Sequence, residues 1–159
     1  MVPGCSIGPS KMPDSEKSAL TPATDRSSYT SWAFDKLRLG DTDGQGHVNN
    51  AVFATFAETG RIEFMRDDTL SLDRTGLGFV VVRLEIDFRS ELHWPGKIDI
   101  GTRLLAVGRT SWRLEHGMFD AERCVATAVS VMVTIDGGTR RPTPVPEPLR
   151  GWLNARLAR

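Results

Sequence analysis

A single helical pattern among several strand patterns is the feature that most restricts how this chain can fold. From Asn50 to about Arg66, apolar or small residues recur with helical spacing. They fall on one face of the predicted helix: Val52, Phe53, Phe56, Gly60 and Phe64. The apolar face of a long helix must pack against another element, and the rest of the chain offers mainly strands.

Five segments have the alternation or the β-branched content that is typical of strands. They are residues 31–39, 79–89, 97–108, 111–120 and 124–135. In the second segment, apolar side chains at even positions from Val82 to Phe88 alternate with charged ones. The last segment is apolar or small on both faces, as expected for a strand inside a sheet. We therefore predict an α+β protein in which one antiparallel sheet packs on one long helix.

Changes in composition mark the limits of the folded unit. Half of residues 1–30 are Pro, Gly, Ser or Thr, so we predict that residues 1–29 form a disordered leader. Pro95 is the only proline between residues 31 and 141, whereas four prolines occupy alternate positions from 142 to 148. We predict one folded domain over residues 30–141, with a proline-rich connector and a short C-terminal helix in residues 142–159.

Charge and hydropathy argue against several classes of function. The chain has 20 basic and 20 acidic residues, and this balance gives no support for nucleic-acid binding. It has no run of about 18 apolar residues, so we expect no membrane insertion. The first residues lack the apolar segment of a signal peptide, and we expect a cytoplasmic protein. Because no metal-ligand motif or phosphate-binding glycine loop is present, we expect no metal and no cofactor.

The polar run GDTDGQGHVNN, residues 40–50, stands directly before the predicted helix. Backbone N–H groups at a helix start are unpaired and attract a developing oxyanion. An aspartate in the same loop can act as a nucleophile or a general base. Together these parts would suit attack on a carbonyl carbon. The same residue types are also ordinary in turns and helix caps, so chemistry alone leaves both interpretations open.

The segment LGDTDGQGHVNNAVFATFAETGRIEF, residues 39–64, resembles the signature of hot-dog-fold acyl-CoA thioesterases of the 4-hydroxybenzoyl-CoA thioesterase type. That signature runs Asp-x-Asp-x-x-Gly-His-Val-Asn-Asn, with an aromatic residue, a glutamate and an arginine further along. The matching residues are Asp41, Asp43, Gly46, His47, Val48, Asn49, Asn50, Glu58 and Arg61. A match at so many fixed offsets is specific. Phe53 departs from the many relatives that carry tyrosine there, and we assign it to the core.

The resemblance implies a hot-dog fold, in which an antiparallel sheet of five to six strands wraps around one long helix. It also implies a homodimer paired through sheet edges, or a homotetramer, with acyl-CoA bound between subunits. The activity it implies is hydrolysis of an acyl-CoA thioester to the free acid and coenzyme A. In this assignment Asp43 is the catalytic carboxylate, and the backbone N–H of Asn50 polarises the thioester carbonyl.

Further site residues follow from the same resemblance. Glu58 is a catalytic candidate, because another branch of hot-dog thioesterases uses a carboxylate on the helix; otherwise we expect an ion pair with Arg61. Independently of the resemblance, we assign His93 and His116 to sheet edges and core and not to chemistry. The residues expected to bind the substrate or to shape its site are Gly46, His47, Val48, Asn49 and Arg89, the last because coenzyme A carries phosphates.

Two other functions stay open at the level of sequence. The domain could bind acyl-CoA without hydrolysing it, or the acyl group could be delivered by an acyl-carrier protein. The intact Asp-x-x-Gly-His-Val-Asn-Asn run favours an enzyme, since a pure binding module has little use for an acid beside an oxyanion site. The motif specifies neither the acyl chain nor the choice between a nucleophilic and a general-base aspartate.

Overall fold

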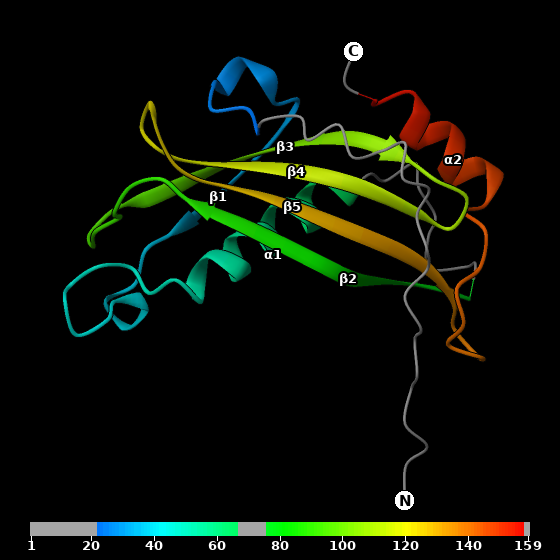
Figure 1. Cartoon of the computed structure of the whole chain (residues 1–159), viewed down its shortest axis with the longest axis horizontal. Coiled ribbons are helices and arrows are strands. Elements are labelled where there is room, and N and C mark those ends of the chain that lie inside the picture. The colour runs from blue at the N-terminus through cyan, green and yellow to red at the C-terminus, as the bar shows by residue number, and fades with distance from the viewer. Residues whose placement is uncertain (1–21, 67–75, 158–159) are drawn as a thin grey trace, which may run out of the picture.

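The computed structural model describes residues 22–66 and 76–157. One antiparallel sheet has the strand order β1-β3-β4-β5-β2 (Figure 1). The strands are β1 (Ser31–Lys36), β2 (Leu77–Phe88), β3 (Lys97–Val107), β4 (Ser111–Asp120) and β5 (Arg123–Asp136). The helices are α1 (Val52–Met65) and α2 (Glu147–Asn154), and Arg26–Ser28 and Leu39–Asp41 form single 3-10 turns. The predicted α+β arrangement, with five strands and one long helix, is confirmed.

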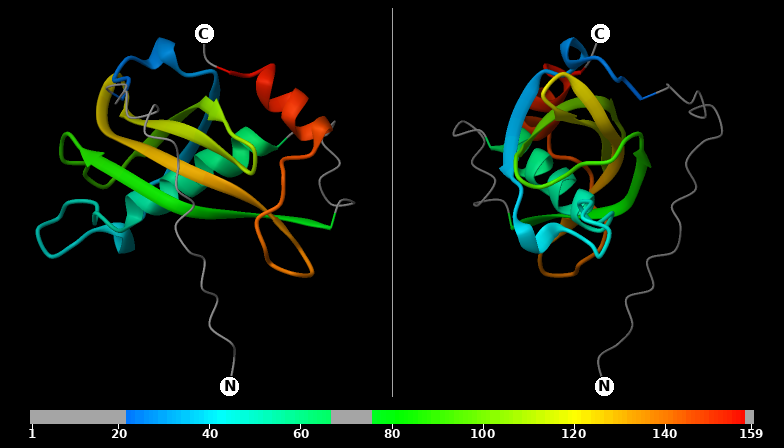
Figure 2. Two further views of the ribbon diagram at one scale, coloured as in Figure 1. Left: turned by 45° about the vertical axis from the view of Figure 1, so that its right-hand side comes forward. Right: turned by 90° about the vertical axis from the view of Figure 1, so that its left-hand side faces the viewer.

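The sheet curves around α1, and Figure 2 shows this best in its right-hand view, which looks nearly along the helix. Six residues of α1 are buried against the sheet: Phe53, Phe56, Ala57, Gly60, Arg61 and Phe64. Four of the five residues predicted for this face are among them. The opposite face of α1 is open, and it carries Glu58 together with Ile62, which is 65% exposed.

Gly60 is the point where α1 comes closest to the sheet. A Cβ atom built there would lie 2.8 Å from both Ile100 Cγ2 and Thr102 Oγ1, both on β3. Contacts this short do not occur between real side chains, so any larger residue would push the helix away from β3. The absence of a side chain therefore sets the helix–sheet distance along the middle of α1.

A buried polar group lies next to this contact. The His116 ring, fully buried on β4, is hydrogen-bonded through Nδ1 to the Thr102 hydroxyl at 3.0 Å and through Nε2 to the Ser130 hydroxyl at 2.7 Å. The Arg61 guanidinium donates to the same Ser130 oxygen at 3.2 Å. Burial lowers the pKa of His116 to about 3, and the positive charge of Arg61 acts in the same direction. The assignment of His116 to the core is confirmed.

Strand β2 is one edge of the sheet and is only partly covered. Its pairing with β5 is interrupted by a bulge between Val81 and Arg83. Val82 is 47% exposed and Phe88 is 49% exposed, although the alternation of the sequence places both on the apolar face. The edge position explains this, because no strand of the described chain covers the outer side of β2.

The segment before β1 is packed on the sheet. Tyr29 is 5% exposed, and its ring lies over Gly101 and Gly117, where any Cβ would come within 2.7 Å of Tyr29 side-chain atoms. The N–H of Ala23 donates to Glu115 Oε1 at 2.9 Å. The folded unit thus begins several residues before the predicted boundary at residue 30. Residues 1–21 lie outside the described range, so the disordered leader stays a prediction there.

The predicted C-terminal helix is present as α2. Its Leu149 and Leu153 are buried in a second core cluster with Phe64, Leu104 and Trp112. This cluster fills the end of the sheet where α1 finishes, so the helix after the prolines completes the core of the domain. Within the described residues, no helix is long and apolar enough to cross a bilayer.

Candidate active site

The polar run before α1 folds into a tight loop around the Asp43 side chain. Asp43 Oδ1 accepts hydrogen bonds from the N–H groups of Gln45 at 2.8 Å and His47 at 3.2 Å. The loop is closed by the Asp43 N–H, which donates to the His47 carbonyl at 2.8 Å. Gly46 has φ +81, a conformation that favours glycine. Asp43 Oδ2 has no hydrogen-bond partner among the described residues, so one carboxylate oxygen holds the loop and the other is free to react.

Asp41, the other aspartate of the motif, has a structural role. Its Oδ2 accepts from the backbone N–H of Arg38 at 2.8 Å, which closes the 3-10 turn over Leu39–Asp41. Its carbonyl accepts from the N–H of Asn49 at 2.8 Å. These bonds fix the start and the end of the loop relative to each other.

A segment that follows β2 holds the other side of the loop. The N–H of Val48 donates to the Leu92 carbonyl at 2.8 Å, and His47 and His93 form an antiparallel bridge. Val48, the single apolar residue of the run, is 3% exposed and belongs to the main core cluster. Val48 therefore anchors an otherwise exposed loop between the core and residues 89–93.

The start of α1 leaves one backbone N–H without a partner. Asn49 Oδ1 accepts from the N–H of Ala51 at 2.9 Å, and the Asn49 carbonyl accepts from the N–H of Val52 at 2.9 Å. Within the described part of the chain, the N–H of Asn50 makes no hydrogen bond. It is thus an open donor at the positive end of the helix dipole.

Asn49 and Asn50 give a matched pair of substitutions for testing whether the Asn49 side chain caps α1. Asn49→Ala is expected to lower the free energy of unfolding by about 1 kcal/mol, the usual cost of losing a helix-capping side chain. Asn50→Ala should change it by less than about 0.5 kcal/mol, because the Asn50 side chain has no partner among the described residues and the backbone N–H is retained. Urea unfolding of both variants would compare them. Equal losses would mean that Asn49 is not the cap.

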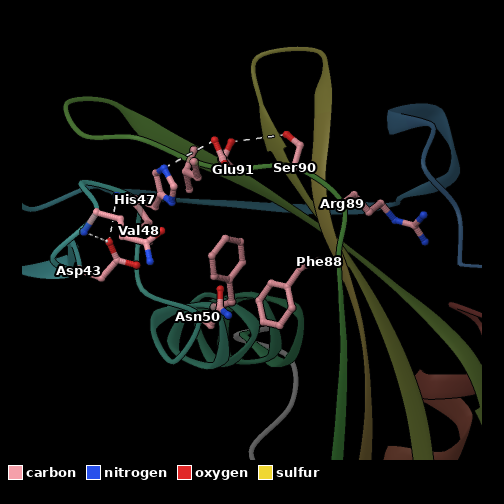
Figure 3. A pocket seen from close by; sticks show the side chains of 11 residues that line it. Asp43, His47, Val48, Asn50, Phe88, Arg89, Ser90 and Glu91 are labelled. Carbon is pink, nitrogen blue, oxygen red and sulfur yellow. Dashed lines mark hydrogen bonds and ion pairs between the residues drawn. The ribbon is translucent and has the colours of Figure 1, made fainter.

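The loop, the first turn of α1 and residues 88–92 enclose a pocket of about 380 Å³ (Figure 3). Its apolar wall is formed by Phe53 and Phe88, whose rings meet edge to face with centroids 5.2 Å apart. Asp43, His47 and Asn50 supply polar groups at its rim. Phe53, which we assigned to core packing, is 2% exposed and also lines this wall.

The pocket brings together five of the predicted site residues. They are Asp43, His47, Val48, Asn50 and Arg89. Gly46 and Asn49 shape the loop without lining the pocket. The Arg89 guanidinium donates to the Thr127 hydroxyl at 3.0 Å and points away from Asp43 in Figure 3. Arg89 therefore lines the pocket, but its charged group is directed away from Asp43.

Glu58 lies outside the pocket of this single chain. It is exposed on the open face of α1, and the expected ion pair with Arg61 is not formed among the described residues. The reason is the direction of Arg61, which is buried toward the sheet and donates to Ser130 at 3.2 Å. Burial lowers the pKa of Arg61, and the negative charge of Glu58 only opposes that shift. A catalytic role for Glu58 stays a prediction.

Sequence reasoning missed the contribution of residues 90–93. Glu91 Oε2 lies 3.6 Å from His47 Nε2 and 3.7 Å from His93 Nε2, so three residues with metal-ligating side chains meet at the rim. The sequence predicted no metal cluster, because the two histidines are far apart along the chain and no local spacing connects them. A usable signal was the pair Glu91 and His93, two apart and directly after the edge strand.

Comparison with known proteins agrees with this fold and motif. The model of the thioesterase-like superfamily matches residues 37–153. A curated relative, the 1,4-dihydroxy-2-naphthoyl-CoA hydrolase of Synechococcus elongatus (strain ATCC 33912 / PCC 7942 / FACHB-805), is 29% identical over 126 residues, which are 74% of this chain and 90% of the relative. An acyl-acyl carrier protein thioesterase of Arabidopsis thaliana chloroplasts is 27% identical over 72% of this chain and 63% of its own length.

Among solved structures, a thioesterase from Thermus thermophilus in complex with coenzyme A and zinc is 32% identical. It superposes with a TM-score of 0.70 over 83% of this chain and 98% of its own. The region matched by the family model contains the whole loop, α1 and all strands except β1. The chain belongs to the thioesterase-like superfamily and is a hot-dog-fold thioester hydrolase.

Proposed function

We propose that this protein is an acyl-CoA thioesterase whose reaction takes place in the pocket between Asp43 and the start of α1. The observation that carries the proposal is that two groups without hydrogen-bond partners lie in one pocket. Asp43 Oδ2 and the N–H of Asn50 have no partner in the described structure, and both residues line the same pocket. A free carboxylate oxygen and a free amide donor are the groups that thioester hydrolysis needs.

In this proposal the N–H of Asn50 donates a hydrogen bond to the thioester carbonyl oxygen. As the carbonyl carbon becomes tetrahedral, negative charge develops on that oxygen, and a fixed donor at a helix N-terminus stabilises it without reorganisation. The carbon–sulfur bond then breaks, and coenzyme A leaves as the thiol after protonation. The donor is held in place by the Asn49 cap and by the hydrogen bond from Asn49 to Asp41.

Asp43 provides the attacking group by one of two routes. Its Oδ2 attacks the carbonyl carbon and forms a mixed anhydride that water hydrolyses, or it removes a proton from the water that attacks. In both routes the loop holds the carboxylate through Oδ1 while Oδ2 reacts. The net reaction consumes one water and yields a carboxylic acid and a thiol.

We place the part of the acyl group next to the thioester against the apolar wall formed by Phe53 and Phe88. An edge-to-face aromatic pair presents an apolar surface that suits aromatic and aliphatic groups alike. Coenzyme A is the preferred carrier in this proposal, because the relative whose own length is 90% covered is a CoA-thioester hydrolase. The chloroplast relatives make acyl-carrier protein the second carrier to test.

We further propose that the active form is a homodimer, or a tetramer built from such dimers, joined along β2. This edge strand is 12 residues long and leaves Val81, Val82 and Phe88 exposed by 40%, 47% and 49%. An uncovered apolar edge is a ready site for pairing with a second strand. It also leads directly into the pocket segment 88–92, so a second chain would border the pocket.

A charge on this edge is expected to break the assembly. Val82→Glu should shift the protein to a smaller species in sedimentation velocity, because pairing would bury the new carboxylate without a partner. Val82→Thr, which keeps the β-branched shape without a charge, is the matched control and should sediment like the wild type. If Val82→Glu leaves the sedimentation coefficient unchanged, β2 is not the subunit interface.

The activity is tested by thiol release from a panel of substrates. Short, long and aromatic acyl-CoAs and one acyl-acyl carrier protein are incubated with the protein, and free thiol is followed with a colorimetric reagent. We expect turnover with at least one acyl-CoA and faster release from CoA than from the carrier protein. Binding of acyl-CoA by calorimetry without any thiol release would instead indicate a non-catalytic binding module.

A further inference from the structure

Beyond the thioester chemistry, we propose that His47, Glu91 and His93 form a binding site for one divalent transition-metal ion of the zinc class. Their ligand atoms lie within 4.8 Å of one another. Glu91 Oε2 is 3.6 Å from His47 Nε2 and 3.7 Å from His93 Nε2. With zinc–ligand bonds of about 2.0–2.2 Å, two ligand atoms of a tetrahedral ion lie about 3.3–3.6 Å apart. The Glu91–histidine separations are close to this geometry before any metal binds.

The orientation of His93 supports the assignment. Its Nδ1 lies 3.3 Å from the Gly46 carbonyl oxygen, which can only accept, so this nitrogen carries the proton. In the neutral ring the lone pair is then on Nε2, the nitrogen that faces Glu91. A backbone carbonyl that fixes the tautomer of a histidine in this way is the usual outer support of a metal-ligating imidazole.

The backbone holds both histidines side by side. His47 and His93 face each other across the antiparallel bridge, and their rings meet edge to face with centroids 5.0 Å apart. One ligand nitrogen of each ring lies within 4.8 Å of the other ligand atoms of the cluster. Two imidazoles and one carboxylate suit zinc or cobalt, and they leave one coordination position open. His47 and Glu91 also line the pocket, so the ion would sit at its rim.

The ion would clamp the catalytic loop to the segment after β2. His47 belongs to the loop that is closed around Asp43 by the His47 N–H and carbonyl. Glu91 and His93 belong to the opposite segment, which contacts the loop through the Val48–Leu92 hydrogen bond and the His93–Gly46 contact. A bound metal adds coordinate bonds across the same gap, so loop opening becomes rarer when metal is present.

The test is metal binding by the full-length protein, with Zn²⁺ and Co²⁺ as probes. We expect one Zn²⁺ per chain by calorimetry, and a rise in Tm of about 5–10 °C at a free Zn²⁺ concentration near 100 times Kd. His93→Gln and Glu91→Gln should each weaken binding by about 100-fold or more. The control is Glu122→Gln, which removes an exposed carboxylate in the β4–β5 turn and should leave the affinity unchanged.

Two further readouts separate this site from other ways of binding zinc. Cys5 and Cys124 are the two thiols of the chain, so the Cys5→Ser/Cys124→Ser variant should bind Zn²⁺ like the wild type, and bound Co²⁺ should show no thiolate charge-transfer band. Hydrogen exchange of residues 43–48 should slow when Zn²⁺ is added to the wild type but not to His93→Gln. Unchanged affinity in His93→Gln, or loss of binding on cysteine replacement, would overturn the site. None of these readouts depends on thioester hydrolysis.

Discussion

An Asp43→Asn variant is expected to keep its fold and to lose about 100-fold or more in kcat, the scale for removing a general base or nucleophile. The substitution separates chemistry from loop shape. Asparagine retains an Oδ1 that can accept from the N–H groups of Gln45 and His47, as the aspartate does at 2.8 and 3.2 Å. It removes the negative charge and the basicity of Oδ2. Steady-state thiol release would show a loss in kcat with a smaller change in KM.

The neighbouring aspartate supplies the control. Asp41→Asn also removes one carboxylate from the loop, but Asp41 Oδ2 is engaged by the N–H of Arg38 at 2.8 Å. We expect this variant to keep kcat within about threefold, because it loses no reacting group. Asp43→Ala should have a lower free energy of unfolding than Asp43→Asn, since it also deletes the acceptor that closes the loop. Near-normal turnover by Asp43→Asn would remove Asp43 from the mechanism.

Lowering the pH from 7 to 5 is expected to reduce the free energy of unfolding by about 2 kcal/mol through His116 alone. Burial lowers the pKa of this ring to about 3 in the folded protein, whereas the unfolded chain has the ordinary value near 6.5. Between pH 7 and 5 the folded state therefore keeps His116 neutral while the unfolded state takes up a proton. The unfolded state is favoured as the pH falls, so stability decreases toward pH 5 and is greatest above the unfolded pKa.

Urea unfolding at pH 7, 6 and 5, at one protein concentration, measures this dependence. His116→Gln, which keeps a donor and an acceptor for Thr102 and Ser130, should flatten it. His93→Gln removes an exposed ring and should leave most of the pH dependence of stability unchanged. Asp99 titrates below this range: burial acts to raise the pKa of Asp99, but Lys97 and Arg26 together lower it. Equal wild-type stability at pH 7 and pH 5 would contradict a neutral buried imidazole, whether or not the variants fold.

The sequence predicted the elements well because each has a strong local pattern. The helical spacing from Val52 to Phe64 fixed the face of α1 that meets the sheet, with Val52 itself only half-buried. The alternation from Val82 to Phe88 identified β2 correctly, yet two of its apolar side chains are about half exposed. Alternation reports which side of a strand is apolar. It does not report whether the strand lies at an edge, which depends on the order of strands in the sheet.

The ion pair expected between Glu58 and Arg61 shows the limit of local rules. Residues three apart on an isolated helix are neighbours. In the folded protein, however, Arg61 is turned toward β5, where the hydroxyl of Ser130, 69 positions away, accepts its hydrogen bond. Burial of the guanidinium is possible because a sheet residue from another part of the chain supplies a partner. No pattern within the helix could indicate this partner.

Sequence alone determined the loop that we propose to be catalytic: a carboxylate, the glycines that bend the chain around it and an asparagine cap all lie within residues 40–50. Such features depend on neighbouring residues, so spacing reveals them. Tertiary structure alone decided what faces that loop, since it placed Phe88, Glu91 and His93 beside it and left β2 open at the edge. These contacts join segments far apart in the sequence, and they exist only because the sheet folds around α1 and returns the end of β2 to the start of the helix.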